Sequence, residues 1–148
     1  MGNKPNVWAR RKARRALVQA VYQWQMSAGT YAQICGEFAS SEALKKADVE
    51  YFETLLREVM SDATQLDAVF APFLDRTADQ LDVVERAVLR LATTELSNHI
   101  EVPYRVVIDE YVELTKVFGA EDAHKYVNGV LDKVAQQLRA IEFKAQRG

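Results

Sequence analysis

Residues 82–96 read Asp-Val-Val-Glu-Arg-Ala-Val-Leu-Arg-Leu-Ala-Thr-Thr-Glu-Leu, and the prediction of the fold starts from this segment. Its apolar side chains recur at the three- and four-residue steps of an α-helix, and Asp82 is a suitable N-cap. The stretch is strongly apolar and has further helical segments on both sides. It therefore predicts a helix at the centre of the core.

The segments around this helix have the same periodicity. Apolar stripes are predicted at residues 13–24, 52–69, 107–118 and 127–141, and a weaker one at 31–44. Asp48 is a plausible N-cap, Pro72 should break a helix near Phe70, and Gly119 should end one. Glu121 and Asp122 should open the last helix, which is expected to bury Ile141. No strand-like alternation of useful length occurs. The sequence predicts an all-α fold, a compact bundle of about six or seven helices.

Length and composition indicate one globular domain. A chain of 148 residues can bury roughly 68–70% of its unfolded surface, which is enough for a core without staples. Cys35 is the single cysteine, so an internal disulfide is impossible and a reducing compartment is favoured. No apolar run approaches the ~18–20 residues that cross a membrane, and we expect a cytoplasmic protein. An organelle transit peptide is the alternative explanation for the Arg-rich start.

Basic residues gather at the start of the chain. The first fifteen residues contain six of the nineteen Lys and Arg side chains and no acid, which leaves thirteen basic against twenty-one acidic residues in the remainder. The six are Lys4, Arg10, Arg11, Lys12, Arg14 and Arg15. A cationic end on an otherwise acidic protein is typical of a phosphate-binding surface. Tyr22 follows on the same predicted helix, and charge beside a flat ring favours RNA as the ligand.

The sequence gives little support for a catalytic function. His99 and His124 lie in separate segments, and neither has companions at metal-ligand spacing. The glycines are scattered and form no nucleotide-binding fingerprint. We therefore predict a protein that is not an enzyme and has neither a cofactor nor a metal site.

The arginine-rich helix has a defined face. Arg11, Arg15, Val18 and Tyr22 are spaced by four, three and four residues, which places them on one side of the helix, with Arg10 and Arg14 on an adjacent edge. Like charges there repel one another, and an anionic partner would relieve the repulsion. Neutralising about four phosphates of a single strand predicts a slope near −3 for log affinity against log salt. A solvated arm without a partner is the alternative.

A second feature joins the last two long helices. Residues 118–132 read Phe-Gly-Ala-Glu-Asp-Ala-His-Lys-Tyr-Val-Asn-Gly-Val-Leu-Asp. Lys125 and Tyr126 could supply a cation and a stacking ring, and Asp122 an acceptor for a base edge. The alternative is a plain helix junction with Tyr126 in the core.

These two features, with the motifs between them, resemble the NusB family of bacterial transcription antitermination factors. The likeness runs in order along nearly the whole chain. It is carried by Arg10-Arg11-Lys12-Ala13-Arg14 with Tyr22-Gln23-Trp24-Gln25, Asp48-x-x-Tyr51-Phe52, Val84-Glu85-Arg86-Ala87-Val88, Val102-Pro103-Tyr104, and the closing Val127-Asn128-Gly129-Val130-Leu131-Asp132.

The resemblance implies two small helical subdomains, at about 5–75 and 76–143. It also implies binding to single-stranded boxA RNA of ribosomal RNA leader transcripts, together with the small-subunit ribosomal protein NusE, and indirect action on RNA polymerase. The RNA-facing residues that it implies are Arg10, Arg11, Arg14, Phe118, Asp122, Lys125 and Tyr126. The NusE-facing residues that it implies are Tyr22 and Glu85.

Two other hypotheses stay open. In one, the chain is a helical protein-interaction module or a homodimer whose Arg-rich helix binds protein. In the other, it is an enzyme fragment, because the N-terminal domain of certain ribosomal RNA cytosine methyltransferases is similar to this family. Trp8 belongs to a slightly extended N-terminus, and either RNA contact or self-association would suit it.

Overall fold

The computed structural model describes residues 6–147, so Lys4 and Pro5 lie outside the described part of the chain. Within that part every regular element is a helix, which confirms the predicted all-α class. The α-helices are α1 (Val7–Ser27), α2 (Tyr31–Ala39), α3 (Val49–Phe70), α4 (Val83–Asn98), α5 (Tyr104–Phe118), α6 (Ala123–Leu138) and α7 (Ala140–Arg147). Three short 3-10 turns complete the described elements: η1 (Glu42–Leu44), η2 (Ala71–Phe73) and η3 (Ala78–Gln80).

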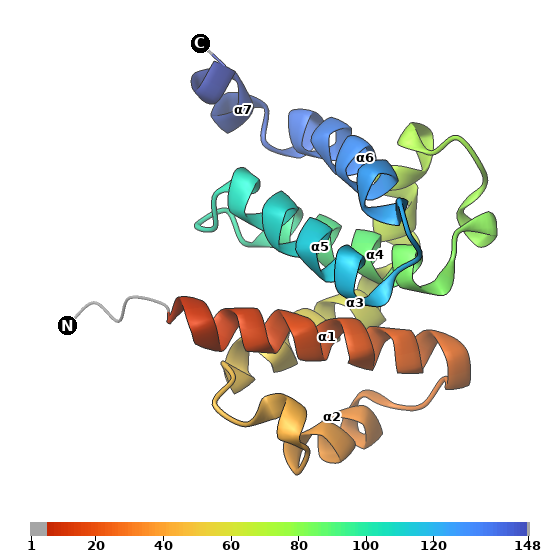
Figure 1. The fold of residues 1–148 in the computed structure, drawn as a ribbon, viewed down its shortest axis with the longest axis vertical. Coiled ribbons are helices and arrows are strands. Elements are labelled where there is room, and N and C mark those ends of the chain that lie inside the picture. The colour runs from red at the N-terminus through yellow and green to blue at the C-terminus, as the bar shows by residue number, and fades with distance from the viewer. Residues whose placement is uncertain (1–5, 148) are drawn as a thin grey trace.

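Helix α4 lies at the centre of the molecule, as the opening stretch predicted. It packs against α1, α3, α5 and α6, and Figure 1 shows α1 and α2 on one side of it with α5, α6 and α7 on the other. Leu89, Leu91 and Ala92 have no exposed surface. Fully burying one such leucine is worth roughly 1.5–3 kcal/mol, so this helix anchors the core.

The predicted helix starts and stops are confirmed at three places. The Asp48 carboxylate accepts a hydrogen bond from the backbone N–H of Tyr51, and Asp82 caps α4 in the same way at Val84. Helix α3 ends at Phe70, two residues before Pro72. Local side-chain chemistry therefore sets these boundaries.

The prediction of one final helix through Ile141 is wrong. The chain breaks at Arg139, and Ile141 lies on α7 with 88% of its surface exposed. The cause is the Arg139 guanidinium, which is buried and donates hydrogen bonds to backbone carbonyls at the end of α4 and in the following loop. The acceptors are Glu95, Leu96, His99 and Val102.

That guanidinium replaces apolar packing at the junction of α4, α6 and α7. It supplies donors at the end of α4, where the last carbonyl groups of a helix lack the full set of intrahelical partners. Glu142 holds it from the other side at 2.6 Å, and Phe143 then packs on Tyr104 with ring centroids 5.3 Å apart. None of the helices in residues 6–147 is long and apolar enough to cross a membrane.

Candidate nucleic-acid interface

Helix α1 has one buried side and one exposed stripe. Asn6 caps it by accepting from the N–H of Ala9. The buried side includes Ala13, Ala16, Leu17, Ala20 and Val21. The exposed stripe, at steps of three and four residues, is Trp8, Lys12, Arg15, Gln19, Tyr22 and Met26. Three of the four residues on the predicted face, Arg11, Arg15 and Tyr22, are exposed, but Val18 is 1% exposed and belongs to the buried side.

Arg14 is inside the protein, and its predicted contact with RNA is wrong for this structure. Only 3% of the residue is exposed. Its guanidinium donates three hydrogen bonds of 3.0–3.1 Å to the Glu95 carboxylate, which has no exposed surface. A buried acid on α4 attracts a cation from α1, and this ion pair leaves no part of Arg14 for phosphate.

Two tyrosines complete the environment of this ion pair. The hydroxyl of Tyr51 donates to Glu95, and burial together with that carboxylate raises the pKa of Tyr51. Burial and the same charge raise the pKa of Tyr111. Burial alone lowers the pKa of Arg14, but the charge of Glu95 and its hydrogen bonds raise it further, so Arg14 stays charged.

Arg10 and Arg11 are partly engaged within the protein. The Arg10 guanidinium lies 4.1 Å from the centre of the Tyr51 ring and 3.5 Å from Asp48. Arg11 donates to Glu110 at 2.9 Å, yet 48% of its side chain is exposed. An exposed ion pair of this kind is weak, so Arg11 remains available to an anion.

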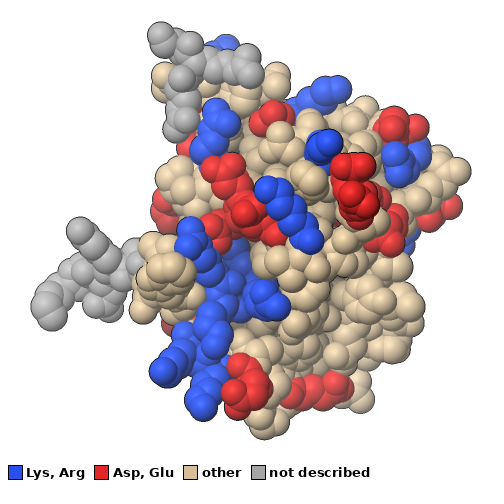
Figure 2. All heavy atoms as spheres, viewed as in Figure 1, with Lys and Arg blue, Asp and Glu red and all other residues tan. Residues whose placement is uncertain are grey.

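Lys12 and Arg15 are the open cations of this surface. Both are exposed, and neither has an ion-pair partner among residues 6–147. The Arg15 guanidinium lies 5.3 Å from the centre of the Phe118 ring on α5. Figure 2 shows basic side chains gathered where α1 lies in Figure 1. The helical spacing had placed Arg15 on the predicted face, but the resemblance implied neither Lys12 nor Arg15 as an RNA contact; their exposure and lack of ion-pair partners in the described chain identify them.

A groove runs between this part of α1 and α5. Its volume is about 520 Å³, and its lining residues are Trp8, Arg11, Lys12, Arg15, Glu110, Glu113, Leu114 and Val117. Three of the eight are cations from α1. The groove combines positive charge with apolar wall on the scale of a nucleotide.

The remaining predicted RNA residues lie at the α5–α6 junction, in different environments. Phe118 ends α5 beside Arg15, and so joins the basic face of α1. Asp122 follows with a positive φ of 72° and lies 3.4 Å from the Lys125 ammonium; both side chains are largely exposed. The structure therefore leaves Asp122 and Lys125 open at the start of α6.

Tyr126 has a different environment. Its hydroxyl accepts a hydrogen bond from the backbone N–H of Asp75 at 3.2 Å, and the Arg76 guanidinium covers its ring at 4.3 Å. Partial burial raises the pKa of Tyr126. Tyr126 thus ties α6 to the loop between η2 and η3, and one face of its ring is already occupied.

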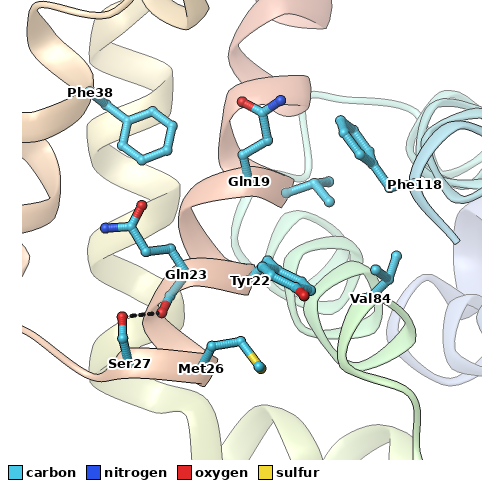
Figure 3. A pocket seen from close by; sticks show the side chains of 9 residues that line it. Gln19, Tyr22, Gln23, Met26, Ser27, Phe38, Val84 and Phe118 are labelled. Carbon is cyan, nitrogen blue, oxygen red and sulfur yellow. Dashed lines mark hydrogen bonds between the residues drawn. The ribbon is translucent and has the colours of Figure 1, made fainter.

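A second groove continues along α1 past Phe118. Its volume is about 580 Å³, and its lining residues are Val18, Gln19, Tyr22, Gln23, Met26, Ser27, Phe38, Val84 and Phe118. Figure 3 shows Tyr22 pointing from α1 toward the helices that carry Val84 and Phe118. Tyr22 is 41% exposed and Met26 60% exposed, so this mostly apolar groove is open to a partner.

Glu85, which the resemblance implies as a NusE-facing residue, is not an exposed acid. It is 7% exposed, and its carboxylate accepts from the backbone N–H of Asp82 in a capping box at the start of α4. The acid is used to satisfy a helix end, so the exposed cap residue Asp82 carries the accessible charge there. No group of three His, Cys, Asp or Glu side chains that could hold a metal ion occurs in residues 6–147.

A helical bundle whose first helix presents a cationic face and then an apolar groove is an all-helical binding module. The chain matches the NusB family over residues 11–136 and belongs to that family.

Relatives and solved structures agree with this assignment. The chain is 49% identical over 147 residues to the transcription antitermination protein NusB of Alcanivorax borkumensis, covering 99% of this chain and 98% of that protein. NusB of T. maritima superposes with a TM-score of 0.81 at 31% identity, covering 97% and 99% of the two chains. A chain from a complex of NusB and NusE with dsRNA superposes at 0.79 with 26% identity, covering 89% and 99%.

Proposed function

We propose that this protein is a cytoplasmic, non-enzymatic transcription antitermination factor that binds the boxA element of ribosomal RNA leader transcripts together with NusE. The observation that carries the proposal is the exposed, unpaired charge of Lys12 and Arg15 beside the Phe118 ring. Membership of the NusB family supports it, as does the likeness to a chain from a NusB–NusE complex with dsRNA. Action on RNA polymerase would be indirect, through the assembled complex.

The RNA would lie along the first half of α1. Lys12, Arg15 and Arg11 hold phosphates and fix the register of the strand, while Arg10 stays engaged with Tyr51 and Asp48. Phe118, Lys125 and Asp122 at the α5–α6 junction contact unstacked bases, the ring by stacking and the carboxylate by accepting from a base edge. Tyr126 offers one remaining ring face, because Arg76 covers the other.

NusE would occupy the apolar groove around Tyr22. Tyr22 and Met26 provide exposed apolar surface next to the Phe118 ring, where the RNA surface ends. Both ligands then adjoin on one helix. Two weak binders that share an RNA reinforce each other, because each raises the effective concentration of the other.

The test is a gel-shift series with boxA-like and scrambled RNA, with and without NusE. We expect boxA-like RNA to bind more tightly than scrambled RNA and NusE to increase the difference. Arg15→Gln should weaken both RNAs, whereas Asp122→Ala should reduce the preference for boxA. Equal affinity for both RNAs under every condition would reject the proposal.

The open groove also favours a second candidate, a homodimer or protein-interaction module. Exposed Tyr22 and Met26 would suit a second copy of this chain as well as NusE. Light scattering with and without RNA separates the two. RNA that leaves a dimer intact argues for the protein-binding function, and RNA that dissociates a dimer argues for a masked RNA site.

A further inference from the structure

Trp8 is a large aromatic side chain that the fold leaves outside its core. It lies in the first turn of α1, on the exposed stripe, and 72% of its surface is accessible. The Arg11 guanidinium lies 5.1 Å from the ring centre. This cation restricts the indole from one side and leaves its other surface open.

The groove beside Trp8 suits one nucleotide. Leu114 and Val117 of α5 form its apolar wall, and Val117 is 54% exposed. Its two acids are neutralised locally, because Glu110 pairs with Arg11 at 2.9 Å and Glu113 pairs with Lys116 at 2.8 Å. The hydrogen bond from Lys116 lowers the pKa of Glu113 and keeps it ionised.

Lys12 and Arg15 border the same groove without acidic partners in the described chain. Unpaired cations lie along one edge, an apolar wall along another, and an accessible ring at the end. A phosphate can pair with such cations, and a flat base can stack on an accessible ring beside an apolar wall. A peptide helix would gain nothing from the two open cations unless it were acidic.

We propose that Trp8 and the wall formed by Leu114 and Val117 make a base-binding subsite, in which one unstacked RNA base stacks on the indole while its phosphate pairs with Lys12 or Arg15. This inference rests on the proposed function, since it extends the RNA surface by one nucleotide toward the N-terminus of α1. In this proposal Trp8 contributes to the affinity for RNA and does not contribute to the packing of the core.

Stacking and charge have separable signatures. Removing a stacking ring weakens binding by about tenfold, within a range of roughly 5- to 150-fold, without changing the salt dependence. Removing a phosphate contact instead makes the slope of log affinity against log salt shallower, by about 0.7 per contact on single strands. Trp8→Ala should therefore lower the affinity at an unchanged salt slope, whereas Lys12→Gln should make the salt slope shallower.

The experiment uses the full chain, a labelled boxA-like RNA and an abasic strand of the same length. Anisotropy of the labelled RNA gives affinity and its salt slope for wild type, Trp8→Ala, Trp8→Phe and Lys12→Gln. Tryptophan fluorescence of wild type minus that of Trp8→Phe isolates the Trp8 signal from that of Trp24. Circular dichroism checks that each variant is folded. We expect folded variants, because Trp8 and Lys12 are both exposed.

We expect Trp8→Ala to lose about tenfold in affinity with an unchanged salt slope, and Trp8→Phe to retain most of the affinity. The Trp8 fluorescence should be quenched by the boxA-like RNA and not by the abasic strand.

Binding of RNA with no change in Trp8 fluorescence, and with wild-type affinity in Trp8→Ala, would overturn the subsite and leave the proposed function intact. Absence of RNA binding by wild type would overturn both. Conversion of a dimer to a monomer by Trp8→Ala, without loss of RNA affinity, would assign Trp8 to self-association and also overturn the subsite.

Discussion

Arg14 and Arg15 are neighbours in the chain and have opposite surroundings. Arg14 is enclosed with Glu95, and Arg15 is exposed beside Phe118. On a helix, adjacent residues point about 100° apart, so one faces the core while the next faces solvent. A run of arginines is therefore not one functional unit. Arg14 stabilises the fold, and Arg15 presents its charge to solvent.

The buried ion pair predicts a large loss of stability in Arg14→Ala. The variant leaves the Glu95 carboxylate buried without its cation, which costs roughly 3–5 kcal/mol. Arg14→Met combined with Glu95→Gln should recover part of that loss, because the amide still accepts from Tyr51. Urea unfolding followed by circular dichroism measures both.

Arg11→Ala is the matched control for this prediction. Its ion pair with Glu110 is half exposed and should change the free energy of unfolding by less than about 1 kcal/mol. Equal losses for Arg11→Ala and Arg14→Ala would contradict the structural role assigned to Arg14.

The two buried tyrosines predict a loss of stability at high pH. Burial raises the pKa values of Tyr51 and Tyr111 in the folded protein, so these groups keep their protons above pH ~10, where unfolded tyrosines ionise. The unfolded state then binds fewer protons, and the free energy of unfolding falls as pH rises through that range. Below pH ~10 the stabilisation is fully present.

Tyr111→Phe tests this dependence on pH. Removing one such proton should make the fall in unfolding free energy shallower by about 1.4 kcal/mol per pH unit above pH ~10. Denaturant titrations from about one pH unit below that value to one above it give the slope for both proteins. The same slope in Tyr111→Phe and wild type would show that Tyr111 ionises normally in the fold.

At the scale of elements, the α5–α6 junction positions the residues proposed to contact RNA. Helix α5 ends at Phe118, Gly119 follows, and Asp122 starts the next helix in a left-handed conformation. A Cβ at position 119 would lie 2.8 Å from the carbonyl oxygen of Thr115, closer than backbone atoms allow. Glycine is required there because the chain leaves α5 tightly against the carbonyl group of its last turn.

Gly119→Ala should therefore destabilise the protein by roughly 1–3 kcal/mol, because the end of α5 must move. Gly129→Ala is the control, with an expected effect of opposite sign. It lies within α6, and a Cβ added there would meet no atom within 4 Å, so Gly129→Ala should stabilise by about 0.5–1 kcal/mol. Thermal unfolding of both variants measures the signs. Stabilisation by Gly119→Ala would contradict the account of this junction.

Sequence periodicity located the helices and their caps well, because apolar spacing and short polar caps are local signals. The central position of α4, the cap at Asp48 and the stop at Gly119 all follow from such patterns. The break at Arg139 does not, because its cause is a set of carbonyls more than thirty residues earlier in the chain. Long-range polar contacts leave no periodic trace.

The same reasoning separates the residues of the candidate site. The spacing placed Arg15 and Tyr22 on the exposed face of α1, but it could not show that Arg14, on the adjacent edge, is buried. That burial depends on Glu95, eighty-one residues away. The use of Glu85 in a helix cap was visible in the spacing from Asp82, but a capping acid and a partner-binding acid have the same signature.

At the scale of the whole molecule, α1 connects two surfaces that meet at Phe118. Its first half presents the cations and the groove beside Trp8, and its second half the apolar groove around Tyr22. The division into subdomains at about 5–75 and 76–143 remains a prediction. Helix α1 packs against α4 and α5 (Figure 1), so both surfaces draw on both halves of the chain.

The burial of Arg14 changes the expected electrostatics of RNA binding. Three exposed cations, Arg11, Lys12 and Arg15, remain on this face in place of the four that the sequence suggested. The slope of log affinity against log salt should accordingly be near −2 and not −3, at about 0.7 per phosphate on a single strand.

That slope is the most direct test of the central claim, and anisotropy of boxA-like RNA between about 50 and 200 mM salt measures it. Wild type should give a value near −2, and Lys12→Gln combined with Arg15→Gln should reduce it to about −0.7 while the protein stays folded. A wild-type slope that the double variant leaves unchanged would contradict the claim that the open cations of α1 hold the RNA.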